Sequence, residues 1–148
     1  MILLDFKAFP RRGRIIGIDW GAARTGIAVC DDGRDFVFTR DVLPSRDADA
    51  AIAQIVDMAR AECAVGIVMG LPLRVDGSDS DTTKTVRAVA DKLAGMTDLP
   101  IWLLDETLTS VAAAERRGIK TRRDARTKLD SESARVLLEN AIAIMRRI

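Results

Sequence analysis

The chain has no histidine and only two cysteines among its 148 residues. Without histidine, a Ser-His-Asp triad, a Cys-His dyad and a histidine-ligated zinc site are all excluded. Cys30 and Cys63 lie in apolar segments without metal-type spacing, so we expect two reduced thiols in the core. No apolar run is long enough for a transmembrane helix, and the N-terminus lacks the features of a signal peptide. Catalytic chemistry in this chain must therefore rest on carboxylates.

Three carboxylates stand beside apolar segments. Asp19 lies within the apolar run 14–20, Glu106 ends the run 100–106, and Asp130 begins the last apolar helix. A lone carboxylate is costly to bury unless it is paired or binds a metal. Hard oxygen ligands suit Mg²⁺ or Mn²⁺. Three such residues from separate segments indicate a divalent metal site, and two ions ~4 Å apart would suit phosphodiester hydrolysis.

Each of these acids also has an ordinary structural explanation. Asp19 is equally a turn residue that accepts hydrogen bonds from its own loop. Asp105 and Glu106 fit an acidic helix N-terminus, and because neighbours in a strand point to opposite faces, only one of them can face a site easily. Asp130 is on the apolar stripe of the last helix, one turn before Ala134, but aspartate is also a favoured helix N-cap.

Positive charge is concentrated in one segment. Residues 116–128 hold seven basic residues and one acid, for a formal charge of +6, so the rest of the chain carries −5 of the total of +1. Such a patch indicates an anion site on an acidic body, and we expect Arg122, Arg123 and Arg126 to contact a nucleic-acid backbone. The alternative is a solvated surface. The segment has no aromatic residue, so base stacking is not indicated there.

The pattern of elements predicts an α/β fold. Three short strands at 14–20, 25–30 and 36–39 are joined by tight turns and must pair antiparallel. Strands at 65–70 and 101–105 alternate with helices at 47–62 and 81–95, and helices at 107–117 and from about 130 onward complete the chain. The result is a mixed five-stranded sheet with helices on both faces. Residues 1–13 form an N-terminal extension that Phe6 and Phe9 can dock, and residues 14–148 form a single domain.

The topology brings the acids together. Right-handed crossovers place the strands at 65–70 and 101–105 beside the first strand. The carboxyl ends of these strands then share one edge, where open α/β sheets bind ligands. Asp19, Glu106 and the loop after Gly70 would converge there. That loop contains Arg74, which can contact phosphate, although a plain connector is the simpler interpretation.

Four short motifs occur in order between residue 14 and the C-terminus. Together they resemble the YqgF/RuvX family of pre-16S rRNA nucleases, also called Holliday junction resolvase-like proteins. The motifs are Ile16-Gly17-Ile18-Asp19-Trp20-Gly21 with Arg24-Thr25-Gly26-Ile27-Ala28-Val29, then Val68-Met69-Gly70-Leu71-Pro72 with Asp76-Gly77-Ser78, then Asp105-Glu106-Thr107-Leu108-Thr109-Ser110, and finally Leu129-Asp130-Ser131.

The resemblance implies a ribonuclease H-like fold and a cytoplasmic nuclease that depends on Mg²⁺ or Mn²⁺ and matures the 5′ end of 16S rRNA. It implies that the family's acidic trio falls on Asp19, Glu106 and Asp130, as catalytic residues and metal ligands. The family's arginine after the first turn falls on Arg24, a phosphate contact. The chain departs from the family pattern in three places. Thr107 stands where the family usually has arginine, the turn at 21–23 lacks the usual Thr-Lys, and Glu132 and Arg135 replace residues that are commonly apolar.

Other functions stay open. A sugar-kinase or actin-like ATPase also begins with a strand, an Asp-x-Gly turn and a hairpin, but it needs two such domains around its nucleotide. A non-catalytic RNA- or ribosome-binding module would keep the fold without the chemistry. A junction resolvase would use the same metal chemistry on branched DNA. Phosphate contacts carry no sequence information, so the basic segment does not separate RNA from DNA. Both a monomer and a homodimer are compatible with the sequence.

Overall fold

The computed structural model describes residues 1–105 and 122–147, and of residues 122–131 only the backbone. The expected helix at 107–117 lies outside the described residues. The elements follow in the order β1 (Ile2–Leu3), β2 (Ile15–Asp19), β3 (Arg24–Cys30), β4 (Val37–Pro44), α1 (Ala48–Ala61), β5 (Gly66–Leu71), α2 (Asp81–Ala94), β6 (Ile101–Asp105) and α4 (Arg122–Arg146).

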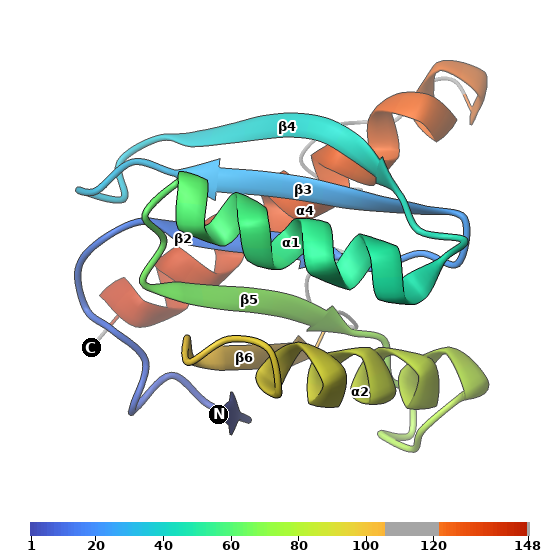
Figure 1. Ribbon diagram of the computed structural model, residues 1–148, viewed down its shortest axis with the longest axis horizontal. Coiled ribbons are helices and arrows are strands. Elements are labelled where there is room, and N and C mark those ends of the chain that lie inside the picture. The colour runs from blue at the N-terminus through green and yellow to red at the C-terminus, as the bar shows by residue number, and fades with distance from the viewer. Residues whose placement is uncertain (106–121, 148) are drawn as a thin grey trace.

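The strands form one mixed sheet in the order β1-β6-β5-β2-β3-β4. Strands β2, β3 and β4 pair antiparallel, whereas β2, β5, β6 and β1 are parallel to one another. The mixed α/β sheet and its antiparallel start confirm the prediction. Because β2, β5 and β6 are parallel, their carboxyl ends share one edge, as expected (Figure 1).

The strand count differs from the prediction, because the sheet formed by the described residues has six strands and not five. The additional strand, β1, lies in the N-terminal segment and pairs Ile2 with Ile101 and Leu3 with Trp102. The carbonyl oxygen of Met1 also accepts a hydrogen bond from the Ile101 N–H at 2.8 Å. Two residues are too few to show the alternation by which a strand is recognised in a sequence.

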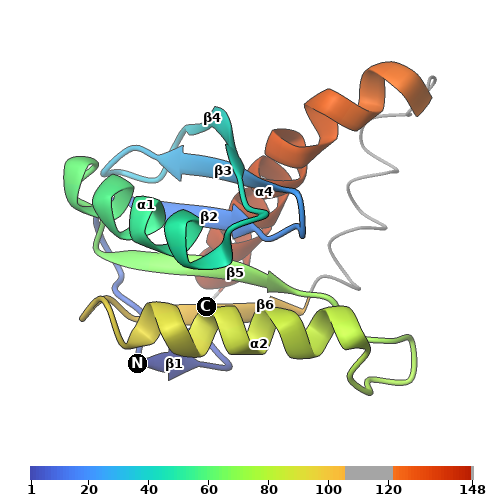
Figure 2. The ribbon, with the colours of Figure 1, turned by 45° about the vertical axis from the view of Figure 1, so that its right-hand side comes forward.

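Helices cover both faces of the sheet. Helices α1 and α2 lie on one face and α4 on the other (Figures 1 and 2). Successive side chains of β2 point to opposite faces of the sheet, so the strand contributes to both cores. Ile16 and Ile18 belong to the core under α1 and α2. Ile15 packs with Leu137 and Leu138 of α4. This double burial explains why β2 is a continuous apolar run.

The two helices of the first face begin close to their predicted positions. Asp47 caps α1, because its side chain accepts a hydrogen bond from the Ala50 N–H. Ser80 and Thr83 form a reciprocal capping box at the start of α2. Such caps satisfy N–H groups that have no partner inside the helix. In the described part of the chain, no helix combines the length and apolarity needed to cross a bilayer.

Two expectations were wrong. Helix α4 begins at Arg122, so Asp130 lies inside the helix and is not its N-cap. Helix-favouring basic residues before Asp130 extend the helix beyond the apolar stripe that predicted it. Cys63 is exposed and not in the core, because it follows α1 in a left-handed turn with φ of 53°. Cys30 is buried, as expected.

The N-terminal segment docks through its aromatic residues, as the sequence suggested. Phe9 is buried, and its ring fills the place that a Cβ on Gly66 would take. The rings of Phe6 and Phe9 lie 5.8 Å and 5.9 Å from that of Trp102, in tilted orientations. Tilted aromatic pairs at this separation are favourable beyond the area they bury.

Candidate active site

Asp19 is the last residue of β2 and is half-buried. Its strand lies in the middle of the sheet, between β5 and β3. Ile15 and Gly17 precede Asp19 on the same face, which is the face covered by α4. The carboxylate therefore stands at the carboxyl edge of the sheet on the α4 side.

The turn after Asp19 is held by buried hydroxyl groups. Ser45 donates a hydrogen bond of 2.5 Å to the carbonyl oxygen of Gly21, and Thr25 accepts one of 3.3 Å from the Gly21 N–H. A Cβ on Gly21 would collide with the carbonyl oxygen of Arg24, so only glycine fits at this point. The turn ends at Arg24, whose side chain is exposed at the start of β3.

Sequence reasoning did not single out Ser45 or Thr25. The Ser45 contact joins residues 24 positions apart, and it exists only because β3 and β4 pair. Thr25 had a weak local signal, since it is a hydroxyl-bearing residue directly after a Gly-containing turn. Both side chains are buried, and both act by holding the backbone that follows Asp19.

The loop between β5 and α2 forms a small hairpin. Leu73 and Asp79 form a β-bridge, and the Gly77 N–H donates to the carbonyl oxygen of Arg74 at 2.8 Å. The Ser78 hydroxyl and N–H both donate to the carboxylate of Asp76, which holds the pKa of Asp76 below its usual range. Arg74 is exposed on this hairpin, beyond the carboxyl end of β5.

Strand β6 ends at Asp105 on the same edge. Ile101, Leu103 and Asp105 are alternate residues of β6, so their side chains point to the same face of the sheet. Ile101 and Leu103 belong to the core under α1 and α2. Asp105 therefore lies on the face opposite to Asp19, which excludes it as the partner of Asp19 on the α4 side. Glu106 lies outside the described residues.

Helix α4 begins beyond this edge and runs back across the sheet. The carbonyl oxygen of Ala134 would be 3.2 Å from a Cβ on Gly17, so the helix rests directly on β2. The backbone of Asp130 lies one turn before Ala134. Figure 2 shows the amino-terminal part of α4 extending past the carboxyl edge of β5 and β6. The same part contains Arg122, Arg123 and Arg126, whose side chains, like that of Asp130, are not described.

The described residues alone contain no cluster of three or more acidic, histidine or cysteine side chains able to hold a metal ion. Of the expected trio, only the side chain of Asp19 belongs to that part of the chain. The structure thus brings together Asp19, the turn with Arg24 and the hairpin with Arg74 at one edge of the sheet.

Sequence comparison places the chain in a family. The sequence model of the family described as RuvX, Holliday junction resolvase, matches residues 13–143. The chain belongs to the RuvX family. Two curated relatives of this RuvX chain are each named "Putative pre-16S rRNA nuclease". The relative from Maridesulfovibrio salexigens is 36% identical over 133 residues, covering 88% of this chain and 98% of the relative. The relative from Sphingopyxis alaskensis is 37% identical over 147 residues, covering 97% and 95%.

Among solved structures, Thermus thermophilus RuvC in complex with a Holliday junction substrate aligns with a TM-score of 0.57. The alignment covers 91% of this chain and 96% of RuvC, at 11% sequence identity. At that identity the likeness concerns the fold, which is of the ribonuclease H-like type, as predicted. RuvX membership also confirms the expectation of a nuclease, that is, a hydrolase of phosphodiester bonds.

Proposed function

We propose that this RuvX-family chain is a metal-dependent nuclease in which Asp19, Glu106 and Asp130 hold two Mg²⁺ or Mn²⁺ ions. The observation that carries the proposal is the position of Asp19, a half-buried carboxylate at the end of the central strand β2. The carboxyl edge of a parallel sheet is where ligands bind in open α/β folds.

Two features of the backbone support the other two members of the trio. Asp105 points to the face of the sheet opposite to α4. Because neighbouring residues in a strand point to opposite faces, this favours Glu106 as the acid that follows β6 on the α4 side. Asp130 precedes Ala134 by one turn on the apolar stripe of α4, and Ala134 rests on Gly17 of β2. A residue one turn closer to the carboxyl edge than Ala134 is well placed to meet Asp19.

The donor set fits a hard divalent cation, because it consists of carboxylate oxygens. Two such ions, held by Asp19, Glu106 and Asp130, would supply activation of the attacking water and stabilisation of the leaving oxygen. The chain itself positions the substrate. Arg24 and Arg74 are exposed at the same edge and bind phosphates on either side of Asp19. We propose the same phosphate-binding role for Arg122, Arg123 and Arg126, which belong to the first turns of α4.

We propose RNA as the substrate, in the 5′ maturation of 16S rRNA in the cytoplasm. The names of the curated relatives support this choice. Branched DNA is the second candidate, because the family description names a Holliday junction resolvase and the RuvC neighbour was solved with such a junction. Phosphate contacts alone do not separate the two substrates, so the assay must include both.

The test is cleavage of an RNA that carries a 16S 5′ leader and, in parallel, of a four-way DNA junction. Each substrate is incubated with the wild type or the Asp19→Asn variant, in Mn²⁺ or in EDTA. Asp57→Asn is the matched control, because Asp57 is exposed on α1, on the other face of the sheet. We expect Mn²⁺-dependent cleavage of the RNA by the wild type and the control, and none by Asp19→Asn.

The outcomes separate the candidates. Preferential cleavage of the junction, lost in Asp19→Asn, would replace rRNA maturation by junction resolution and keep the metal site. Equal RNA binding by all three proteins without cleavage by any of them would instead favour a non-catalytic RNA-binding module.

A further inference from the structure

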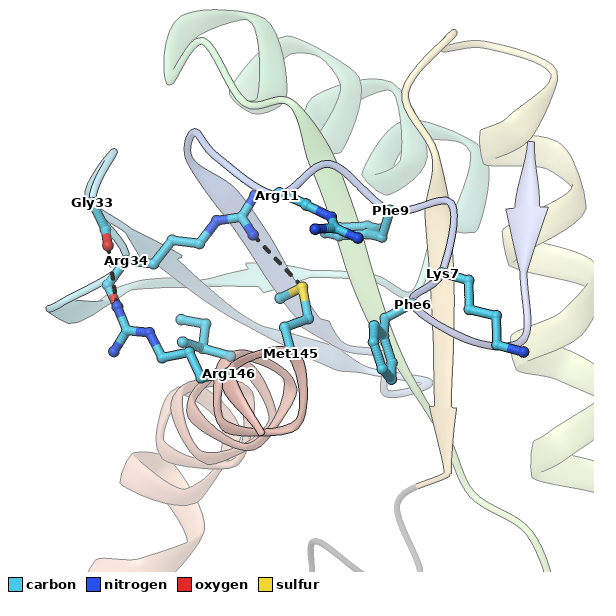
Figure 3. A pocket seen from close by; sticks show the side chains of 9 residues that line it. Phe6, Lys7, Phe9, Arg11, Gly33, Arg34, Met145 and Arg146 are labelled. Atoms are coloured by element: carbon cyan, nitrogen blue, oxygen red, sulfur yellow. Dashed lines mark hydrogen bonds between the residues drawn. The ribbon is translucent and has the colours of Figure 1, made fainter. Parts of the chain in front are cut away.

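A cavity of about 440 Å³ lies far from the proposed metal site, between the N-terminal segment and the last turns of α4 (Figure 3). Arg34, which lines it, donates a hydrogen bond to the carbonyl oxygen of Gly13, just before β2 begins. The cavity is therefore at the amino end of β2, whereas Asp19 is at the carboxyl end. Its volume is within the range of small-molecule sites.

One side of the cavity is apolar and aromatic. Phe6 and Phe9 come from the N-terminal segment, and Ile142 and Met145 come from α4. The two phenylalanine rings pack on Trp102, which fixes them in place. A rigid aromatic wall of this kind is suited to a flat, unsaturated ring, since aromatic side chains stack on nucleobases irrespective of base identity.

The other side of the cavity is cationic. Arg34 is 6% exposed, and its guanidinium donates to the carbonyl oxygens of Gly13 and Pro10 and to the sulfur of Met145. These acceptors are all neutral, so its charge is not balanced by them. Burial lowers the pKa of Arg34, and the positive charge of Arg146 lowers it further. A buried cation beside a second cation creates a positive potential within the cavity.

The remaining charges do not offset this potential. Arg146 donates to the carboxylate of Asp35 at 3.1 Å, which compensates one of the cations. Arg11 is exposed, and its side chain has no hydrogen bond or ion pair within the residues that the structure describes. Lys7 also lines the cavity, although Figure 3 shows its side chain directed away from the other labelled side chains. No acidic residue lines the cavity in the described part of the chain.

We propose that this cavity binds a nucleoside monophosphate unit, with the base against Phe6 and the phosphate at Arg11. An anion with a flat apolar ring satisfies both walls at once: the ring gains stacking and burial, and the phosphate balances the excess cation. The proposal is independent of the metal site, since it involves neither Asp19 nor the carboxyl edge. The unit is either a free nucleotide or one residue of a nucleic-acid strand.

The test is isothermal titration calorimetry of the full chain in EDTA, which prevents metal-dependent cleavage. The probes are AMP, adenosine, ribose 5-phosphate and the RNA pentamer A5. We expect AMP to bind about tenfold more tightly than adenosine or ribose 5-phosphate, because each of these lacks one half of the recognised group. Binding of A5 that is tighter than that of AMP and is weakened by Arg11→Ala identifies a strand as the occupant, and equal binding of the two probes identifies the free nucleotide.

Two adjacent arginines provide a matched pair of variants. Arg11→Ala removes the cation that lines the cavity, and Arg12→Ala removes an exposed cation that does not line it. We expect Arg11→Ala to weaken AMP binding about tenfold and Arg12→Ala to change it less than about twofold. Phe6→Leu keeps an apolar side chain but loses the ring, and it is expected to reduce the affinity for AMP to that for ribose 5-phosphate.

Asp19→Asn distinguishes this site from the metal site. Unchanged AMP binding by that variant, together with loss in Arg11→Ala, supports the proposal even where no nuclease activity is found. The proposal is overturned by the absence of AMP binding, by equal effects of Arg11→Ala and Arg12→Ala, or by loss of binding in Asp19→Asn alone.

Discussion

Gly17 of β2 and Leu138 of α4 are in direct contact across the sheet–helix interface. A Cβ on Gly17 would lie 3.0 Å from the Cβ of Leu138 and 3.2 Å from the carbonyl oxygen of Ala134. The absence of a side chain at Gly17 thus sets the distance between β2 and α4. Since Asp19 follows on β2 and Asp130 precedes on α4, this contact also sets the separation of two proposed metal ligands.

We expect Gly17→Ala to push α4 away from β2. Overpacking of a close contact costs about 1–3 kcal/mol, which chemical denaturation in urea would measure. Displacement of a catalytic group by about 1 Å lowers turnover severely, so cleavage should fall by about tenfold or more. Gly95→Ala is the control, because the nearest atom to its added Cβ is at an ordinary 3.4 Å. Wild-type cleavage by Gly17→Ala would show that the contact does not position the site.

Ser45→Ala tests the turn that follows Asp19. The variant removes the donor of the 2.5 Å hydrogen bond to the carbonyl oxygen of Gly21 and leaves a buried acceptor poorly satisfied. We expect a loss of about 1–2 kcal/mol in the free energy of unfolding and weaker substrate binding, because Arg24 ends the same turn. Ser78→Ala is the control, since the Ser78 hydroxyl is exposed and donates to Asp76 on the surface. Equal stability of the two variants would argue against a structural role for Ser45.

Thermal unfolding in Mn²⁺ tests the metal site without an activity assay. An ion that binds only the native state raises its stability by about 2.7 kcal/mol at a concentration of 100 times Kd. We expect Mn²⁺ to raise the melting temperature of the wild type and of Asp57→Asn, and to have little effect on Asp19→Asn. If Asp19→Asn shows the full shift, Asp19 is not a ligand.

Most of the fold was predictable because its signals are local. Alternation and turn residues identified β2, β3 and β5, and helical spacing with capping residues identified α1 and α2. β1 was missed, because two residues are too few to show the alternation of apolar and polar side chains that marks a strand. It forms only through pairing with β6, far along the chain. The start of α4 was misplaced, since the apolar stripe begins well after the helix does.

The candidate site was predictable in part. Asp19 stood out because a carboxylate in an apolar run requires a partner, whatever the topology. The strand pattern left Asp105 and Glu106 open, because it does not say which face of the strand each residue occupies, and only the family resemblance pointed to Glu106. Ser45 could not be found, since its contact with Gly21 depends on the pairing of two strands. The cavity beside Arg34 likewise joins residues near the two ends of the chain.

Glu62 gives a prediction for the pH dependence of stability. Arg40 donates to its carboxylate at 3.0 Å and Arg14 at 2.9 Å. The hydrogen bond from Arg40, with the contribution of Arg14, holds the pKa of Glu62 below its usual range. A carboxyl group with a depressed pKa in the folded state stabilises the protein fully above its unfolded pKa of about 4.3. That contribution is lost as the pH falls through the folded pKa.

Glu62→Gln should therefore be about 1 kcal/mol less stable than the wild type at pH 7. The difference should begin to shrink below about pH 4.3 and vanish only below the lower pKa that Glu62 has in the folded state. Urea denaturation between pH 3 and pH 7 would measure both quantities. Glu139→Gln is the control, because Glu139 forms an exposed pair with Arg135 within α4, and such i,i+4 pairs contribute only about 0.3–0.5 kcal/mol. A difference in stability between Glu62→Gln and the wild type that stays constant at every pH would mean that the Glu62 side chain acts through packing. The ionised and the protonated carboxyl group would then stabilise the protein equally.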